Sequence, residues 1–138
     1  MKNLLEFESV KKFIQTVGKG VEKYFGKDKP SIVYLQPNGG FYGAALQEWL
    51  RLRKINATIS TMGDAGEGLE EEKVKGRKVL LVDGEITTGT AYKRSMEALR
   101  MKAETLRIKG VKFATYIDRV GVADFSVWKY SPEAIWHP

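Results

Sequence analysis

Two acids and a group of threonines lie close together in the sequence, and their types and spacing suit a phosphorylated, hydroxyl-rich ligand. Asp83 and Glu85 follow the apolar residues 79–82, and threonine fills three of the four positions 87–90. An apolar run of this length is typical of a buried strand, and helical periodicity begins at about residue 92. A helix start offers N–H groups without intrahelical partners, and hydroxyls add further donors. We therefore predict a phosphate site at residues 87–90.

The two carboxylates need a different partner from the threonines. Like charges repel, so Asp83 and Glu85 are not expected to contact a phosphate directly. Carboxylates instead suit sugar hydroxyls, or a divalent cation that bridges hydroxyls and phosphate.

A second candidate loop follows the first predicted strand, residues 31–35. Asn38 precedes two glycines, Gly39 and Gly40, and a helix runs on from there to about residue 53. Glycines at a strand-to-helix junction allow a ligand to approach the backbone closely. Taken alone, this loop is equally consistent with a plain turn.

The composition limits the classes of protein to consider. The chain has 138 residues, of which 43% are hydrophobic and 29% charged, which predicts one globular domain spanning residues 1–138. It lacks cysteine and has one histidine, so thiolate nucleophiles and zinc sites are excluded. The net charge is +6, but the basic residues are spread along the chain and accompanied by 17 acids. This pattern argues against binding of nucleic acid and favours a small polyanionic substrate. Without a bilayer-length apolar run or a signal-peptide core, a cytoplasmic protein is expected.

Strand and helix patterns alternate along the chain. Such alternation predicts an α/β fold with three layers, a mainly parallel doubly wound sheet between flanking helices. The two candidate loops follow the first and third strands, which would be neighbours at the switch point where ligands bind. Residues 62–73 hold five acids and three glycines and predict either a reduced lid or a solvated turn. The predicted helices cover residues 4–25, a segment ending near 53, and 91–108; the strands cover 31–35, 56–61, 79–82, 111–117 and 125–128.

Residues 79–91 resemble the signature of the type I phosphoribosyltransferases. The resemblance implies binding of phosphoribosyl pyrophosphate (PRPP), with the catalytic acids Asp83 and Glu85 near its ribose. It also implies Mg²⁺, held indirectly by Asp83 through ribose hydroxyls or water. Two departures are visible: Gly84 stands where the family usually has a second acid, and one hydroxyl has moved from position 91 to Thr90. The implied phosphate-binding residues are Thr87, Thr88, Gly89, Thr90 and Ala91, and the implied pyrophosphate-binding residues are Asn38, Gly39 and Gly40.

The identity of the base is less sharply indicated. Residues 124–128 and 135–138 are similar to the C-terminal region of the hypoxanthine–guanine and xanthine–guanine enzymes. That similarity implies a base pocket made by Arg119, Phe125, Ser126 and Trp128. Alternation along a strand puts Phe125 and Trp128 on opposite faces, and the resemblance assigns the pocket to Phe125, although both rings are equally consistent with closing the core.

Other residues look like those of the orotate enzymes. Thr87 stands where purine enzymes carry an aspartate and the orotate enzymes a threonine. Asp118 and Arg119, directly after the fourth predicted strand, resemble a segment of the orotate enzymes in which an arginine binds the base. We favour transfer of the phosphoribosyl group to a 6-oxopurine, as in purine salvage, with pyrophosphate release. Transfer to orotate or another pyrimidine, and a regulatory protein that binds PRPP or a nucleotide without turnover, remain the alternatives. The expected partners are PRPP, a nucleobase and a second copy in a homodimer, without nucleic acid or membrane.

Overall fold

The computed structural model describes residues 7–37 and 39–130 of the chain. Its centre is a five-stranded sheet with the order β2-β1-β3-β4-β5, and every neighbouring pair is parallel. The strands are β1 (Pro30–Leu35), β2 (Thr58–Met62), β3 (Lys78–Ile86), β4 (Gly110–Asp118) and β5 (Phe125–Lys129).

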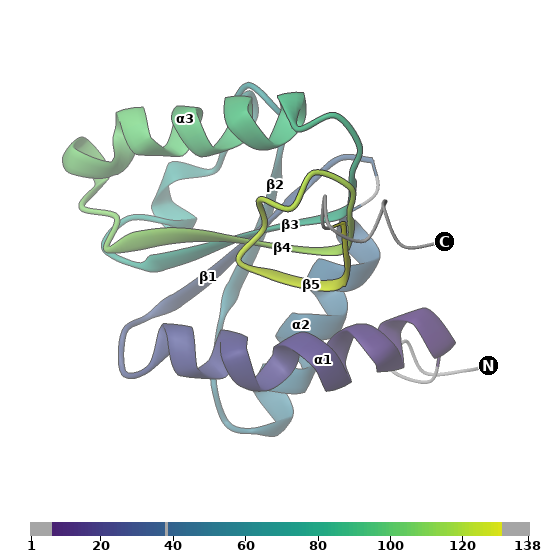
Figure 1. Cartoon of the computed structure of the whole chain (residues 1–138). Helices are drawn as coiled ribbons and strands as arrows, with labels where there is room; N and C mark the ends of the chain where they lie inside the picture. Colours follow the sequence, from purple (N-terminus) through teal and green to yellow (C-terminus); the bar gives the residue numbers. More distant parts are fainter. Residues whose placement is uncertain (1–6, 38, 131–138) are drawn as a thin grey trace.

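Helices cover both faces of this sheet (Figure 1). Helices α1 (Glu8–Phe25) and α2 (Gly40–Leu52) lie on one face, and α3 (Thr90–Leu106) lies on the other. The three-layer α/β prediction is therefore confirmed. Within the described residues, no helix combines the length and the apolar character that crossing a membrane requires.

Strand β3 lies in the middle of the sheet, and this position explains why its side chains are apolar on both faces. Val79 and Leu81 belong to the hydrophobic core under α3. Leu80 and Val82 belong to the core under α1 and α2. All four are fully buried, as expected for a parallel strand covered on both faces.

The first and third strands are direct neighbours, as the sequence predicted. Tyr34 of β1 pairs with Val82 of β3. Chain connections leave this pair in opposite directions, to β2 on one side and to β4 on the other. The ends of β1 and β3 therefore form the switch point at which ligands bind in doubly wound sheets.

Two element boundaries differ from the sequence prediction. Strand β3 does not end at Val82 but continues to Ile86, because β4 is long enough to pair with it as far as Asp118. Asp83 and Glu85 thus lie within the strand. Helix α3 begins at Thr90, so the loop between β3 and α3, where the sequence predicts a phosphate site, is shorter than the sequence suggested.

The acidic segment between β2 and β3 is tied to the body of the protein. Asp64 forms an ion pair with Arg94 of α3 at 3.4 Å, and Glu71 forms one with Lys102 of the same helix at 3.1 Å. Leu69 packs against the core. A short 3-10 helix, Glu71–Lys73, completes the segment.

Two lysines at the end of this segment and after it are bonded to backbone carbonyls. Lys73 donates to the carbonyl of Ile59 in β2. Lys78, the first residue of β3, donates to the carbonyl of Tyr24 at 2.8 Å. Lys78 therefore lies at the opposite end of the sheet from the acids and threonines.

Candidate functional site

The loop between β1 and α2 fits closely against the backbone of the sheet. Gly39 donates its N–H to the carbonyl of Leu35 at 2.9 Å. A β-carbon on Gly39 would lie 2.4 Å from the carbonyl oxygen of Val82 and 2.8 Å from that of Leu35. Only glycine fits there, so the loop lies directly over the ends of β1 and β3. Asn38 lies outside the described residues.

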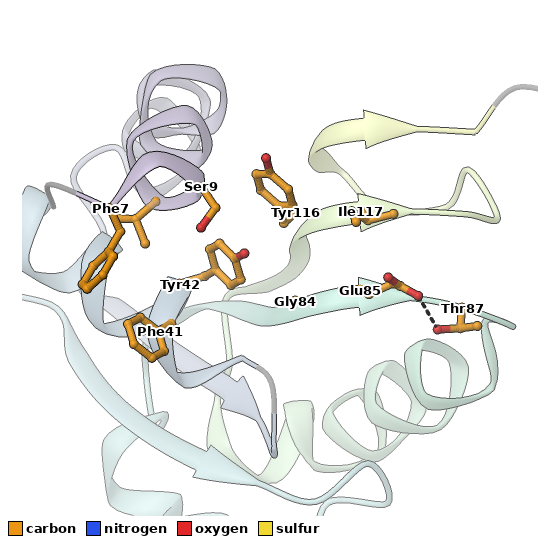
Figure 2. Close-up of a pocket in the computed structure, with 10 residues that line it drawn as sticks. Phe7, Ser9, Phe41, Tyr42, Gly84, Glu85, Thr87, Tyr116 and Ile117 are labelled. Carbon is orange, nitrogen blue, oxygen red and sulfur yellow. Dashed lines mark hydrogen bonds between the residues drawn. The ribbon is translucent and has the colours of Figure 1, made fainter. Parts of the chain in front are cut away.

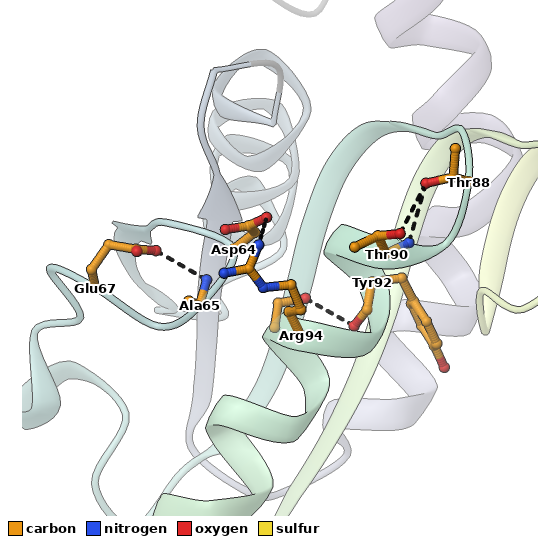
Figure 3. Close-up of polar contacts among 8 residues, drawn as sticks. Asp64, Ala65, Glu67, Thr88, Thr90, Tyr92 and Arg94 are labelled. Carbon is orange, nitrogen blue, oxygen red and sulfur yellow. Dashed lines mark hydrogen bonds and ion pairs between the residues drawn. The ribbon is translucent and has the colours of Figure 1, made fainter.

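The loop between β3 and α3 carries the residues that the sequence predicted to bind phosphate. Gly89 is the N-cap residue of α3, and its φ of 88° is in the left-handed region that favours glycine. The N-cap glycine makes no capping hydrogen bond, and among the first N–H groups of the helix that of Thr90 donates to the hydroxyl of Thr88 at 3.4 Å. Thr88 donates its hydroxyl to that of Thr90 at 3.2 Å (Figure 3).

A small cavity of about 100 Å³, which we call the small cavity, opens at this helix start. The structure thus brings together the acids and most of the predicted phosphate-binding positions, although Thr90 is not among the lining residues. The lining residues are Asp83, Glu85, Ile86, Thr87, Thr88, Gly89, Ala91 and Tyr92.

Asp83 lies partly buried at the base of this cavity. Burial raises the pKa of its carboxyl to about 6, the N–H of Gly84 opposes that rise by donating to Oδ1 at 2.7 Å, and the charge of Glu85 adds to it. A carboxylate in this setting is stabilised by a cation or by hydroxyl donors. That is the chemistry expected of a group that contacts ribose hydroxyls and a bound metal.

Glu85 has a different environment. Its Oε2 atom accepts hydrogen bonds from Arg119 at 3.1 Å and from Thr87 at 3.0 Å. These two hydrogen bonds, of which the one from Arg119 has the larger effect, hold the pKa of the Glu85 carboxyl below its ordinary value. Glu85 is therefore ionised, and it positions the guanidinium of Arg119 and the hydroxyl of Thr87. In this way it connects Arg119 to the loop between β3 and α3.

The described residues contain no group of three or more acids and histidines able to hold a metal by themselves. Mg²⁺ commonly binds through one or two carboxylates together with substrate phosphates and water. The single partly buried carboxylate of Asp83, beside a helix start suited to phosphate, fits that mode. Asp83 is the residue that would hold such an ion, indirectly.

A larger cavity of about 610 Å³ lies on the other side of Glu85, and we call it the aromatic cavity. Phe41 and Tyr42 come from the first turn of α2, and Tyr116 comes from β4 (Figure 2). The rings of Tyr42 and Tyr116 stack with centroids 5.5 Å apart and an interplanar angle of 14°. The lining residues are Phe7, Ser9, Val10, Phe41, Tyr42, Gly84, Glu85, Thr87, Tyr116 and Ile117.

The sequence prediction missed these aromatic residues. A signal was present, because Phe41 and Tyr42 directly follow Gly39 and Gly40, and Tyr116 comes near the end of a predicted strand. Residues at the carboxyl ends of neighbouring parallel strands, and at the helix starts that follow, meet at one edge of the sheet.

Phe125, which the resemblance assigns to the base pocket, packs against helix α1. It is the first residue of β5 and pairs with Ala114 in the middle of β4. Its ring lies against Gly20 of α1, where an added β-carbon would be 2.9 Å from Cε1. Because β5 is parallel to β4, its first residue cannot reach the carboxyl edge. Phe125 does not line either cavity.

The other residues predicted for the base pocket are also dispersed. Ser126 pairs with Thr115 within the sheet. Trp128 is 54% exposed, and the ammonium group of Lys12 lies 4.5 Å from the centre of its ring. Arg119 alone reaches the acids. Residues 131–138, which include the rest of the predicted tail, lie outside the described residues.

Asp118 has a structural task in the loop between β4 and β5. Its carboxylate is buried and accepts backbone N–H bonds from Val120, Gly121 and Ala123 at 2.7–3.1 Å. Asp118 therefore shapes the loop that carries Arg119.

Comparisons with known proteins agree with this architecture. No protein-family model matches the chain, and no curated protein matches it. Among solved structures, a hypoxanthine-guanine-xanthine phosphoribosyltransferase superimposes with a TM-score of 0.69 at 16% identity, covering 87% of this chain and 72% of that one. The HGPRT-ase from Leishmania tarentolae in complex with GMP gives a TM-score of 0.69 at 11% identity, covering 91% and 78%.

A hypoxanthine phosphoribosyltransferase from Staphylococcus aureus gives a TM-score of 0.64 at 12% identity, covering 91% of this chain and 74% of that one. At these identities the likeness concerns the fold. The strand order, the switch point at β1 and β3, and these superpositions together show that the chain has the fold of the hypoxanthine-guanine phosphoribosyltransferases.

Proposed function

We propose that this protein is a PRPP-dependent phosphoribosyltransferase that transfers the phosphoribosyl group to a nucleobase and releases pyrophosphate. The observation that carries the proposal is the meeting of two loops at the β1 and β3 ends, one fitted closely over the sheet by Gly39 and one opening α3 at Gly89. Asp83 lies between them, partly buried.

Each part of PRPP has a matching place in this arrangement. The 5′-phosphate would lie at the start of α3, where the N–H groups and the hydroxyl of Thr88 donate to it. Asp83 would accept hydrogen bonds from the ribose hydroxyls. The pyrophosphate would lie over the loop at Gly39 and Gly40, whose lack of side chains permits close approach.

The chemistry is a displacement at C1 of the ribose. A nitrogen of the base forms a bond to C1 while the bond from C1 to the pyrophosphate oxygen breaks, and pyrophosphate leaves with the electron pair. Positive charge develops on the ribose as this bond breaks, and the Asp83 carboxylate lies where it would stabilise that charge. The proton of the base nitrogen passes to solvent. Mg²⁺, when bound, would offset the charge of the leaving pyrophosphate.

A 6-oxopurine is the base that we propose. The solved structures that share this fold are named for hypoxanthine, guanine and xanthine. Arg119 is bonded to Glu85 at 3.1 Å, and its guanidinium suits a carbonyl oxygen on the base.

The test is a panel of reactions containing PRPP, Mg²⁺ and one base each: hypoxanthine, guanine, xanthine, adenine, orotate or uracil. Pyrophosphate release with a 6-oxopurine, lost in Asp83→Asn, is the expected result. Release only with orotate would contradict the choice of base. Binding of PRPP by calorimetry without release for any base would favour a regulatory protein, an alternative that the Gly84 departure keeps open. Sedimentation equilibrium tests the expected homodimer.

A further inference from the structure

The aromatic cavity adjoins the small cavity across β3. Glu85 and Thr87 line both cavities. A sugar phosphate held at the start of α3 would therefore have its reactive end beside the aromatic cavity. No residue of the predicted base pocket lines that cavity.

The walls of the aromatic cavity suit a flat ring. Phe41 is 61% exposed and Phe7 is 44% exposed, and their rings meet edge to face with centroids 6.0 Å apart. The two phenylalanine rings present apolar surface to water, and a ring stacked on them would cover it. Tyr42 and Tyr116 form the inner wall as a stacked pair. The cavity volume of about 610 Å³ corresponds to roughly 20 water molecules at ~30 Å³ each, enough for a two-ring heterocycle.

The lining residues of the aromatic cavity include one charged residue, Glu85, whose carboxylate can orient such a ring. Both hydrogen bonds that Glu85 accepts within the described part of the chain go to Oε2. A carboxylate oxygen can accept about two hydrogen bonds, so Oε1 remains able to accept an N–H from a ligand. The lining by Glu85 places this acceptor at the boundary between the two cavities.

We propose that the aromatic cavity is the acceptor subsite, and that it takes a planar nitrogen heterocycle stacked on Phe41 and Tyr116 with an N–H directed to Glu85. This inference deepens the proposed function and rests on it for the name of the reaction, but the binding it describes is separable from turnover. It places the base against α1, α2 and β4, and it gives Phe125 no contact with the base.

The experiment measures the contribution of the ring alone. Calorimetry gives the Kd of ribose 5-phosphate and that of inosine monophosphate, and the first divided by the second measures what the ring adds to binding. Phe41→Ala should reduce this ratio about two- to tenfold, the range expected for one aromatic contact, with little change for ribose 5-phosphate. Tyr116→Leu should act in the same direction. Melting temperatures confirm that each variant is folded.

Leu52→Ala is the matched control, because Leu52 lies at the far end of the same helix and is 59% exposed. Its ratio should equal that of the wild type. An unchanged ratio in Phe41→Ala and Tyr116→Leu, or no binding of inosine monophosphate by the wild type, would overturn the subsite. Ring-dependent binding without pyrophosphate release in the base panel would overturn the proposed reaction and leave the subsite standing.

Discussion

The guanidinium of Arg119 donates to the carboxylate of Glu85 at 3.1 Å, and the backbone N–H of Arg119 donates to the carbonyl of Ile86 at 2.9 Å. Side chain and backbone thus both fix this residue to the end of β3. Arg119→Ala should therefore lower kcat/KM for hypoxanthine several-fold, because the cation near the 6-oxygen is lost. Adenine, which has a 6-amino group, should be affected less. Equal effects on both bases in steady-state assays would remove Arg119 from base recognition.

Asp83 should matter more for turnover than for folding. Asp83→Asn keeps the size of the side chain but removes the charge that we propose for binding the ribose, so kcat/KM should fall by about 100-fold or more. Retained activity would transfer the role to Glu85 or show that neither acid is needed. Pyrophosphate release and the melting temperature, measured on the same preparation, separate the two effects.

The same substitution should change how stability depends on pH. Burial raises the pKa of Asp83 from 3.8 to about 6, so the folded protein binds this proton more tightly than the unfolded chain does. Asp83 therefore makes the free energy of unfolding fall as the pH rises from about 4 to about 6. Asp83→Asn should lack this contribution and be at least as stable as the wild type at pH 8. Urea denaturation across this pH range measures the difference, and identical pH slopes in both proteins would contradict it.

Gly39 and Gly40 should respond very differently to alanine. An added β-carbon at Gly39 would lie 2.4 Å from the carbonyl of Val82, whereas at Gly40 it would lie 3.4 Å from the ring of Tyr34. Gly39→Ala should cost about 1–3 kcal/mol or more, as overpacking does, and Gly40→Ala less than about 1 kcal/mol. Chemical denaturation compares them, and similar losses in both would show that the loop moves freely.

A negative charge in the phosphate loop should weaken binding of a phosphorylated sugar. Thr88→Glu should raise the Kd of ribose 5-phosphate about tenfold or more, which is ~1.4 kcal/mol, through repulsion at the start of α3. Thr16→Glu is the control, because Thr16 is exposed on α1 and changes the net charge equally. Equal effects of both variants in calorimetry would reduce the result to net charge alone.

Phe125 should matter for stability and not for the base. Its ring packs on Gly20 and lies 6.5 Å from the ring of Tyr24. Phe125→Ala should cost about 2 kcal/mol, below the ~3–5 kcal/mol typical of fully buried phenylalanine, since the residue is only partly buried. The KM for the base should stay the same. A tenfold rise in that KM without loss of stability would restore the pocket predicted from the resemblance.

The sequence predicted what depends on local pattern. The apolar run at 79–82 and the turn that follows it identified the central strand and the start of α3, because burial on two faces and a helix start leave strong local signals. It could not predict that β3 extends to Ile86, since that extension depends on pairing with a distant strand.

Other features escaped the sequence for the same reason. The segment after β2 looks solvated, yet Asp64 is paired with Arg94, which lies 30 residues later. The resemblance assigned Phe125 to the base pocket, but the register of β5 against β4 decides where along the sheet its ring lies. Tyr116 joins Tyr42 only after folding. Local sequence does not encode such registers and meetings.

The buried carboxylate of Asp118 has a practical meaning for redesign. It holds three N–H groups of residues 120–123 from a fixed point on β4, while Asp124 closes the far end of the loop on Phe113 at 2.9 Å. Parallel strands ordinarily need a crossover of a dozen or more residues. Here residues 119–124 suffice, because the two aspartates accept backbone N–H bonds at the two ends of the loop. Residues 119–122 lie between these two aspartates and can be replaced as a unit. Loops grafted there, with both aspartates retained, would change the side chains beside Glu85 without changing the sheet.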